Sequence, residues 1–110
     1  MFKRELLAQI HQAAKEYPVV TITGPRQSGK TTLAQLAFAK KSYVNLEEPQ
    51  IRRLATEDPR GFLEQYPDGL IIDEAQRAPE LFSYIQVIVD KKKIPGQYIL
   101  TGSHPLNGFR

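Results

Sequence analysis

The stretch GPRQSGKTT at residues 24–32 follows the run VVTIT at 19–23 and precedes a helical pattern of apolar residues at 30–40. It matches G-x-x-x-x-G-K-S/T, the pattern of a loop that wraps around phosphate groups. The run VVTIT is β-branched throughout, which predicts a buried strand. The pattern indicates phosphate binding when the loop joins a strand to a helix, as it is predicted to do here. The stretch therefore predicts an α/β fold.

Each residue type in the loop has a physical task. Gly24 and Gly29 are expected to adopt backbone angles that a side chain would forbid, so that several N–H groups point at one anion. Lys30 would reach the β- and γ-phosphates, Thr31 would place its hydroxyl on Mg²⁺, and Thr32 would contact the α-phosphate. The sequence predicts that the whole loop binds nucleotide: Gly24, Pro25, Arg26, Gln27, Ser28, Gly29, Lys30, Thr31 and Thr32. Within it, Arg26 is expected to shape the loop or to face the nucleotide.

Two adjacent acids follow the apolar run in LIIDEAQ at residues 70–76. An acidic pair at the end of a buried strand is costly unless something there needs it. Asp73 would hold the water shell of Mg²⁺, and Glu74 would orient and deprotonate an attacking water. The predicted catalytic residues are therefore Lys30, Asp73 and Glu74, with Thr31 and Asp73 at the metal. The alternative is a strand that ends in solvated acids.

Strands and helices alternate along the chain. Apolar spacing predicts an amphipathic helix at 2–16, and prolines at first-turn positions predict helices at 49–57, at 59–65 and from Pro79 onward. Short apolar runs predict further strands at 42–46, 69–73 and 97–101. This alternation predicts one parallel sheet of about four strands, covered by helices on both faces.

Composition narrows the class of protein. The 110 residues suffice for one domain, which we expect to span 1–110, and they contain no run of about 18 apolar residues that could cross a membrane. There are no cysteines and no secretory signal pattern, which suits a cytoplasmic protein. The net charge is +3, with basic and acidic residues interspersed, so no nucleic-acid partner is indicated. The triplet Lys91–Lys93 is interpreted as a solvated helix end.

Three parts of the chain together resemble the ATP-binding domain of a large prokaryotic family of AAA-type ATPases. The matching stretches are VVTITGPRQSGKTTLAQLA at 19–37, YVNLEEPQIRRLATEDP at 43–59 with GLIIDEAQRAPELF at 69–82, and QYILTGS at 97–103. The resemblance runs from about Phe2 to Ser103. It implies a P-loop NTPase fold with three α/β/α layers and ATP with Mg²⁺ as cofactors. That family usually couples this domain to a C-terminal domain of unknown, nuclease-like type.

The resemblance also implies roles for polar residues at strand ends. Thr101 or Ser103 would sense the γ-phosphate, although both also suit turn capping around Gly102. Asn45 would hold the catalytic Glu74 in an inactive rotamer, although a residue of this kind is more often a satisfied strand-end side chain. Gln76 would help to position water.

The resemblance leaves parts of the family's domain unaccounted for. AAA-type sheets have the strand order 5-1-4-3-2, and this chain supplies four strands in the expected order 1-4-3-2. The fifth strand, the arginine finger and the helical lid would lie beyond Arg110, so we expect an N-terminal fragment of a longer ATPase. The strand at 19–23 would then be a sheet edge that favours pairing with a second copy of the chain.

Whether this chain is by itself an enzyme is left open by its sequence. ATP binding with hydrolysis near the background rate is the first interpretation. A non-catalytic interaction or structural remnant of such an ATPase is the second. A kinase, a helicase or a GTPase is the third; the chain contains no N/T-K-x-D motif for guanine, and the acid directly after Asp73 favours hydrolysis over transfer to a small molecule.

Overall fold

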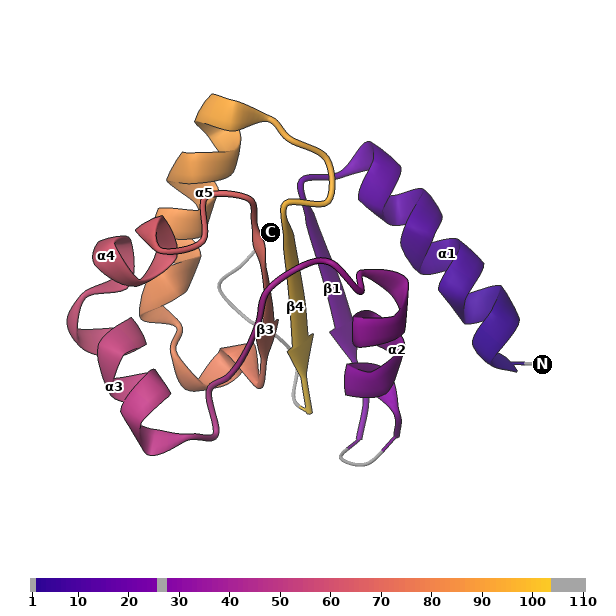
Figure 1. Ribbon diagram of the computed structural model, residues 1–110, viewed down its shortest axis with the longest axis horizontal. Helices are drawn as coiled ribbons and strands as arrows, with labels where there is room; N and C mark the ends of the chain where they lie inside the picture. The colour runs from indigo at the N-terminus through magenta and orange to yellow at the C-terminus, as the bar shows by residue number, and fades with distance from the viewer. Residues whose placement is uncertain (1, 26–27, 104–110) are drawn as a thin grey trace.

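A single parallel sheet runs through the middle of the molecule (Figure 1). The structure is a computed structural model that describes residues 2–25 and 28–103, with the side chains from residue 4 onward. Its elements are, in order, α1 (Phe2–Glu16), β1 (Val19–Thr23), α2 (Lys30–Ala37), β2 (Tyr43–Asn45), α3 (Pro49–Glu57), α4 (Pro59–Glu64), β3 (Leu70–Asp73), η1 (Ala75–Arg77), α5 (Glu80–Lys92) and β4 (Tyr98–Gly102). The four strands are ordered β1-β4-β3-β2, which confirms the predicted fold class and strand order.

The helices cover both faces of this sheet. Figure 1 shows α1 and α2 on one face and α3, α4 and α5 on the other. Successive side chains of the central strands enter different cores, since a strand alternates its faces. Ile71 packs in the core beneath α1 and α2, whereas Ile72 packs in the core beneath α3 to α5. Ile99 and Leu100 of β4 divide in the same way. Burial on both faces explains why β3 and β4 are apolar without alternation.

The register of the strands brings their carboxyl ends to one edge of the sheet. Thr23 of β1 pairs with Gly102 of β4, and Asn45 of β2 pairs with Asp73 of β3. In open parallel sheets, ligands bind in the crevice outside this edge. The phosphate-loop pattern and the acidic pair both begin at this edge, because β1 and β3 each pair in parallel with β4.

Several boundaries differ from those predicted. The helix predicted at 30–40 ends at Ala37, because Phe38 leaves helical angles at φ −130° and ψ 58°. The strand predicted at 42–46 is the three-residue β2, and η1 was not predicted. The basic triplet lies where expected, with Lys91 and Lys92 in the last turn of α5 and all three side chains exposed.

Among the described residues, only β4 pairs with β1, which is therefore an edge strand of the sheet. No helix within the described part of the chain has the length and apolar character needed to cross a membrane.

Candidate phosphate-binding site

The start of α2 forms a hollow beside the end of β1. A cavity of about 270 Å³ is lined there by Gly29, Lys30, Thr31 and Thr32. Helix α2 begins at Lys30, so its first N–H groups and the positive end of its dipole lie at this cavity. The structure thus brings together four of the residues predicted to bind phosphate. Arg26 and Gln27, also predicted to bind nucleotide, lie outside the described residues.

The two glycines of the pattern serve different purposes. Gly29 has φ +88°, in the left-handed region that a side chain disfavours, as predicted. Gly24 does not lie in that region, so the prediction of forbidden angles was wrong for this residue. At Gly24 a Cβ atom would lie 3.2 Å from Oγ of Ser28, a tight contact that requires a small movement of that side chain.

Lys30 is almost completely buried, with 7% of its surface exposed. Its Nζ donates a hydrogen bond to the backbone oxygen of Pro25 at 3.2 Å, across the base of the loop. A buried ammonium needs hydrogen-bond acceptors, and a neutral carbonyl compensates less of its charge than an anion would. The site therefore holds a positive charge that a phosphate group could neutralise.

Three hydroxyl groups converge on the buried carboxylate of Asp73, at the end of β3. Thr31 and Tyr43 donate to Oδ2 at 3.0 and 2.7 Å, and Thr101 donates to Oδ1 at 2.7 Å. These donors come from α2, β2 and β4. The bond from Thr31 joins the phosphate loop to the acidic strand end, as the predicted metal site requires. Thr101, predicted as a sensor, is fully buried and contacts Asp73 directly.

Tyr43 is the member of this group that sequence reasoning missed. It pairs with Ile71, two residues before Asp73, so its side chain lies on the sheet face that Asp73 also shares. Burial, followed by the hydrogen bond and charge of Asp73, raises the pKa of Tyr43 above its ordinary value, which keeps the phenol protonated as a donor. The strand YVN would have indicated this partner only once its pairing register with LIID was known.

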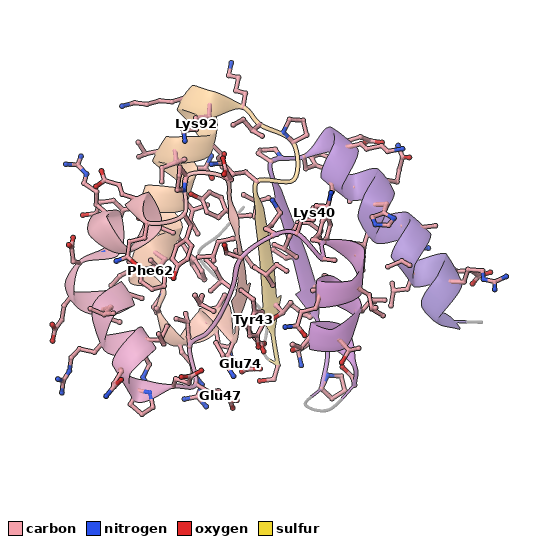
Figure 2. All side chains as sticks on the ribbon, viewed as in Figure 1. Lys40, Tyr43, Glu47, Phe62, Glu74 and Lys92 are labelled. Carbon is pink, nitrogen blue, oxygen red and sulfur yellow. The ribbon has the colours of Figure 1, made fainter. Side chains whose placement is uncertain are left out.

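Glu74 is buried and held by two neighbours. Ser103 Oγ and Gln76 Nε2 donate to its Oε1 at 2.9 and 2.6 Å. The backbone of Glu74 is left-handed, at φ 55° and ψ 49°, and turns the chain from β3 into η1. Figure 2 shows Glu74 and Tyr43 toward the same end of the sheet. Oε1 of Gln76 is buried with no hydrogen-bond partner in the described part of the chain.

Asn45 contacts neither acid through a described hydrogen bond. Its Oδ1 accepts a bond from the backbone N–H of Glu47 at 2.9 Å, which caps the turn after β2. The structure places Asn45 at the correct edge, in register with Asp73, but gives its side chain this local turn-capping contact. The contacts to Glu74 that the resemblance assigns to Asn45 are made instead by Ser103 and Gln76.

The residues present suit a magnesium ion that keeps most of its water. The described residues contain no cluster of three or more His, Cys, Asp or Glu side chains that could enclose a metal. They do offer one hydroxyl, from Thr31, and one carboxylate, from Asp73, next to the phosphate-binding cavity. Mg²⁺ is usually bound in this way, by one or two protein groups together with water and substrate phosphates.

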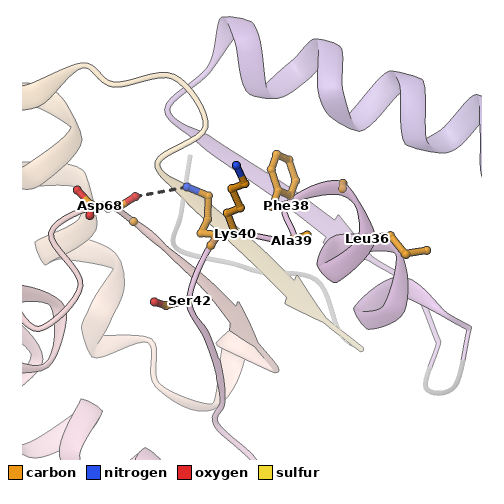
Figure 3. A pocket seen from close by; sticks show the side chains of 9 residues that line it. Leu36, Phe38, Ala39, Lys40, Ser42 and Asp68 are labelled. Atoms are coloured by element: carbon orange, nitrogen blue, oxygen red, sulfur yellow. Dashed lines mark hydrogen bonds between the residues drawn. The ribbon is translucent and has the colours of Figure 1, made fainter.

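One larger cavity adjoins these residues and another lies away from them. One, of about 320 Å³, adjoins the phosphate loop and is lined by Leu6, Ile22, Thr23, Gly24, Pro25, Ser28, Gly29, Lys30 and Leu33. The other, of about 540 Å³, lies at the opposite end of the sheet, beside the residues that precede β2 and β3 (Figure 3). There Lys41 Nζ donates to the backbone oxygen of Asp68 at 3.5 Å, and burial lowers the pKa of Lys41. This larger cavity contains none of the predicted site residues.

Comparisons with known proteins agree with this geometry. Residues 16–109 match a family model described as an AAA domain. Two curated mycobacterial proteins, Mb2031c of Mycobacterium bovis and Rv2008c of Mycobacterium tuberculosis, are each 39% identical over 104 residues. The match covers 92% of this chain but only 23% of each relative. The structure of C. elegans PCH-2 superposes with a TM-score of 0.54 at 14% identity, covering 98% of this chain and 37% of that one.

Proposed function

The chain belongs to the AAA domain family, and from this premise we propose that it binds Mg-ATP at the carboxyl edge of its sheet. The observation that carries the proposal is the hydrogen bond from Thr31 to Asp73. It joins a helix start that suits phosphate to a carboxylate that suits a metal-bound water. The bound Mg²⁺ would neutralise charge on the β- and γ-phosphates.

Lys30 and the first turn of α2 are proposed to bind the phosphates. Lys30 would exchange the carbonyl of Pro25 for phosphate oxygens, which compensate its charge better. The free N–H groups at the start of α2 would donate to the same anion. The apolar cavity beside the loop, lined in part by Leu6, Ile22 and Leu33, is proposed to receive the nucleobase.

Glu74 is proposed as the general base for hydrolysis. Glu74 directly follows Asp73, so it lies at the same carboxyl edge of the sheet as the proposed metal site. In the described conformation Oε1 of Glu74 accepts from both Ser103 and Gln76. To take a proton from water, the carboxylate must offer an oxygen to that water, and because both described contacts are made to Oε1, Oε2 is the oxygen proposed for this role.

Hydrolysis by this chain is proposed to be slow. We propose that the chain is the nucleotide-binding part of a longer ATPase, which the greater length of its curated relatives supports. An arginine finger supplied by another segment or subunit is worth orders of magnitude in rate. Phosphate release should therefore lie near the background rate. Rapid turnover that Lys30→Ala abolishes would contradict this proposal.

Isothermal titration of the chain with Mg-ATP and with Mg-GTP tests the binding site. We expect ATP binding in the micromolar range or weaker, with GTP weaker still, and a loss of at least about tenfold in Lys30→Ala because a buried charged donor is removed. Lys40→Ala, which removes an exposed lysine beyond the end of α2, is the matched control and should leave binding unchanged. Absence of ATP binding in the unaltered chain would favour a non-catalytic role instead.

A further inference from the structure

We infer that Tyr43 keeps Asp73 a water-mediated partner of the divalent cation and so sets a preference for Mg²⁺ over Ca²⁺. The inference rests on the proposed function, because it concerns the cation that accompanies ATP. Tyr43 is a positioning residue here, since its hydroxyl acts through Asp73, to which it donates at 2.7 Å.

The carboxylate of Asp73 has a limited number of acceptor sites for hydrogen-bond donors and cations. An ionised carboxylate has about four lone-pair sites on its two oxygens. The described hydroxyl donors use three of them: Thr31 and Tyr43 both bond to Oδ2, and Thr101 bonds to Oδ1. Oδ2 is thus saturated by Thr31 and Tyr43 together. The site that remains is on Oδ1, and one acceptor site suits a single water held by a metal.

Tyr43 is held by packing, so its hydroxyl stays within hydrogen-bond distance of Asp73. Its ring lies against the core that contains Ile71, Ile99 and Ala34, beneath α1 and α2. The backbone of β2 is paired to β3 through the register of Tyr43 with Ile71. Because the ring and the backbone of Tyr43 are already held in place, ligand binding costs little further conformational entropy at this side chain.

Mg²⁺ and Ca²⁺ differ in how they bind carboxylates. Mg²⁺ gives up its water reluctantly and is commonly bound through few protein groups. Ca²⁺ takes carboxylate oxygens directly, in a larger and more flexible set of ligands. Because both lone pairs of Oδ2 accept hydrogen bonds, this oxygen does not coordinate a cation directly. The site therefore favours Mg²⁺ over Ca²⁺. Removing the hydroxyl of Tyr43 would open a lone pair on Oδ2 to a directly bound cation, which benefits Ca²⁺ more.

Isothermal titration of ATP into the full chain tests this, with EDTA, MgCl₂ or CaCl₂ in the buffer. For Tyr43→Phe we expect the ratio of Mg-ATP affinity to Ca-ATP affinity to fall about tenfold, the size of one hydrogen bond to a charged group. Affinity in EDTA should change by less than about twofold. Tyr66→Phe is the matched control, since Tyr66 is also half-buried and aromatic but packs on Phe62 in the opposite layer.

The outcomes separate this inference from the proposed function. If the unaltered chain binds no ATP, the proposed function is wrong and the inference with it. If it binds ATP without preferring Mg²⁺, or if Tyr43→Phe keeps the original ratio, the inference alone is overturned. A variant that loses affinity equally in all three buffers would show a merely structural role, and thermal unfolding of each variant identifies one that does not fold.

Discussion

At the scale of single residues, the site concentrates charges that folding alone would not favour. Lys30, Asp73 and Glu74 are all buried, with 7%, 6% and 5% of their surfaces exposed. Their described hydrogen bonds are to hydroxyl, amide and carbonyl groups. Such neutral partners compensate only part of the cost of taking an ion out of water. A ligand that carries both negative phosphates and a cation would supply what these residues lack.

Thr101→Val is expected to destabilise the ligand-free chain. The substitution keeps the shape of a fully buried side chain but removes the hydroxyl that donates to Oδ1 of Asp73. We expect the free energy of unfolding to fall by about 1.5–3 kcal/mol, as for other hydrogen bonds to charged groups. Urea denaturation measures it. Thr56→Val, which removes an exposed bond within α3, should cost about 0.5 kcal/mol or less.

At the scale of elements, the sequence predicted the strands and the loop because their signals are local. VVTIT and LIID are apolar runs bounded by turn residues, and GPRQSGKTT carries its own pattern. The details that depend on distant partners could not be predicted. Tyr43 reaches Asp73 only through the pairing of β2 with β3. Glu74 adopts left-handed backbone angles, which its residue type does not indicate. For Asn45 the sequence left two contacts open, and the structure shows the local one, to the backbone of Glu47.

Gly69→Ala is expected to cost more than Gly29→Ala, because the two glycines share a positive φ but differ in surroundings. A Cβ atom at Gly69, just before β3, would lie 2.1 Å from the backbone oxygen of Gln97, whereas nothing lies within 4 Å of one at Gly29. Gly29→Ala should cost about 1–2 kcal/mol of strain alone. Gly69→Ala should cost about 1–3 kcal/mol more, since backbone must move. Equal losses in urea denaturation would contradict this account.

At the scale of the whole molecule, the phosphate loop follows β1, one of the two edge strands of the described sheet. Strand β1 offers a second row of backbone N–H and C=O groups along its outer edge, and α1 flanks it. A cavity of about 380 Å³ lies between them, lined by side chains that include Leu6, Ile10 and Val20. An edge without proline or charge favours pairing with another strand. We propose that a second copy of this chain pairs there.

Thr21→Lys is expected to weaken this self-association, because it places a charge on an exposed position in the middle of β1. Light scattering over a range of concentrations should show association of the unaltered chain and less of it in the variant. Ser83→Lys adds the same charge to an exposed position on α5 and serves as the control. A monomer at every concentration for the unaltered chain would contradict the proposal.

Strand β1 also couples two events that would otherwise be independent. It leads directly into the phosphate loop, and Gly24 begins that loop with a backbone bond to Gly102 at 3.2 Å. A strand that pairs along β1 and a nucleotide that binds at its end would then share one structural element. Linkage requires that any effect be mutual: if ATP strengthens pairing by some factor, pairing strengthens ATP binding by the same factor. Through the edge of this sheet, self-association of the chain and nucleotide binding would then each change the affinity of the other.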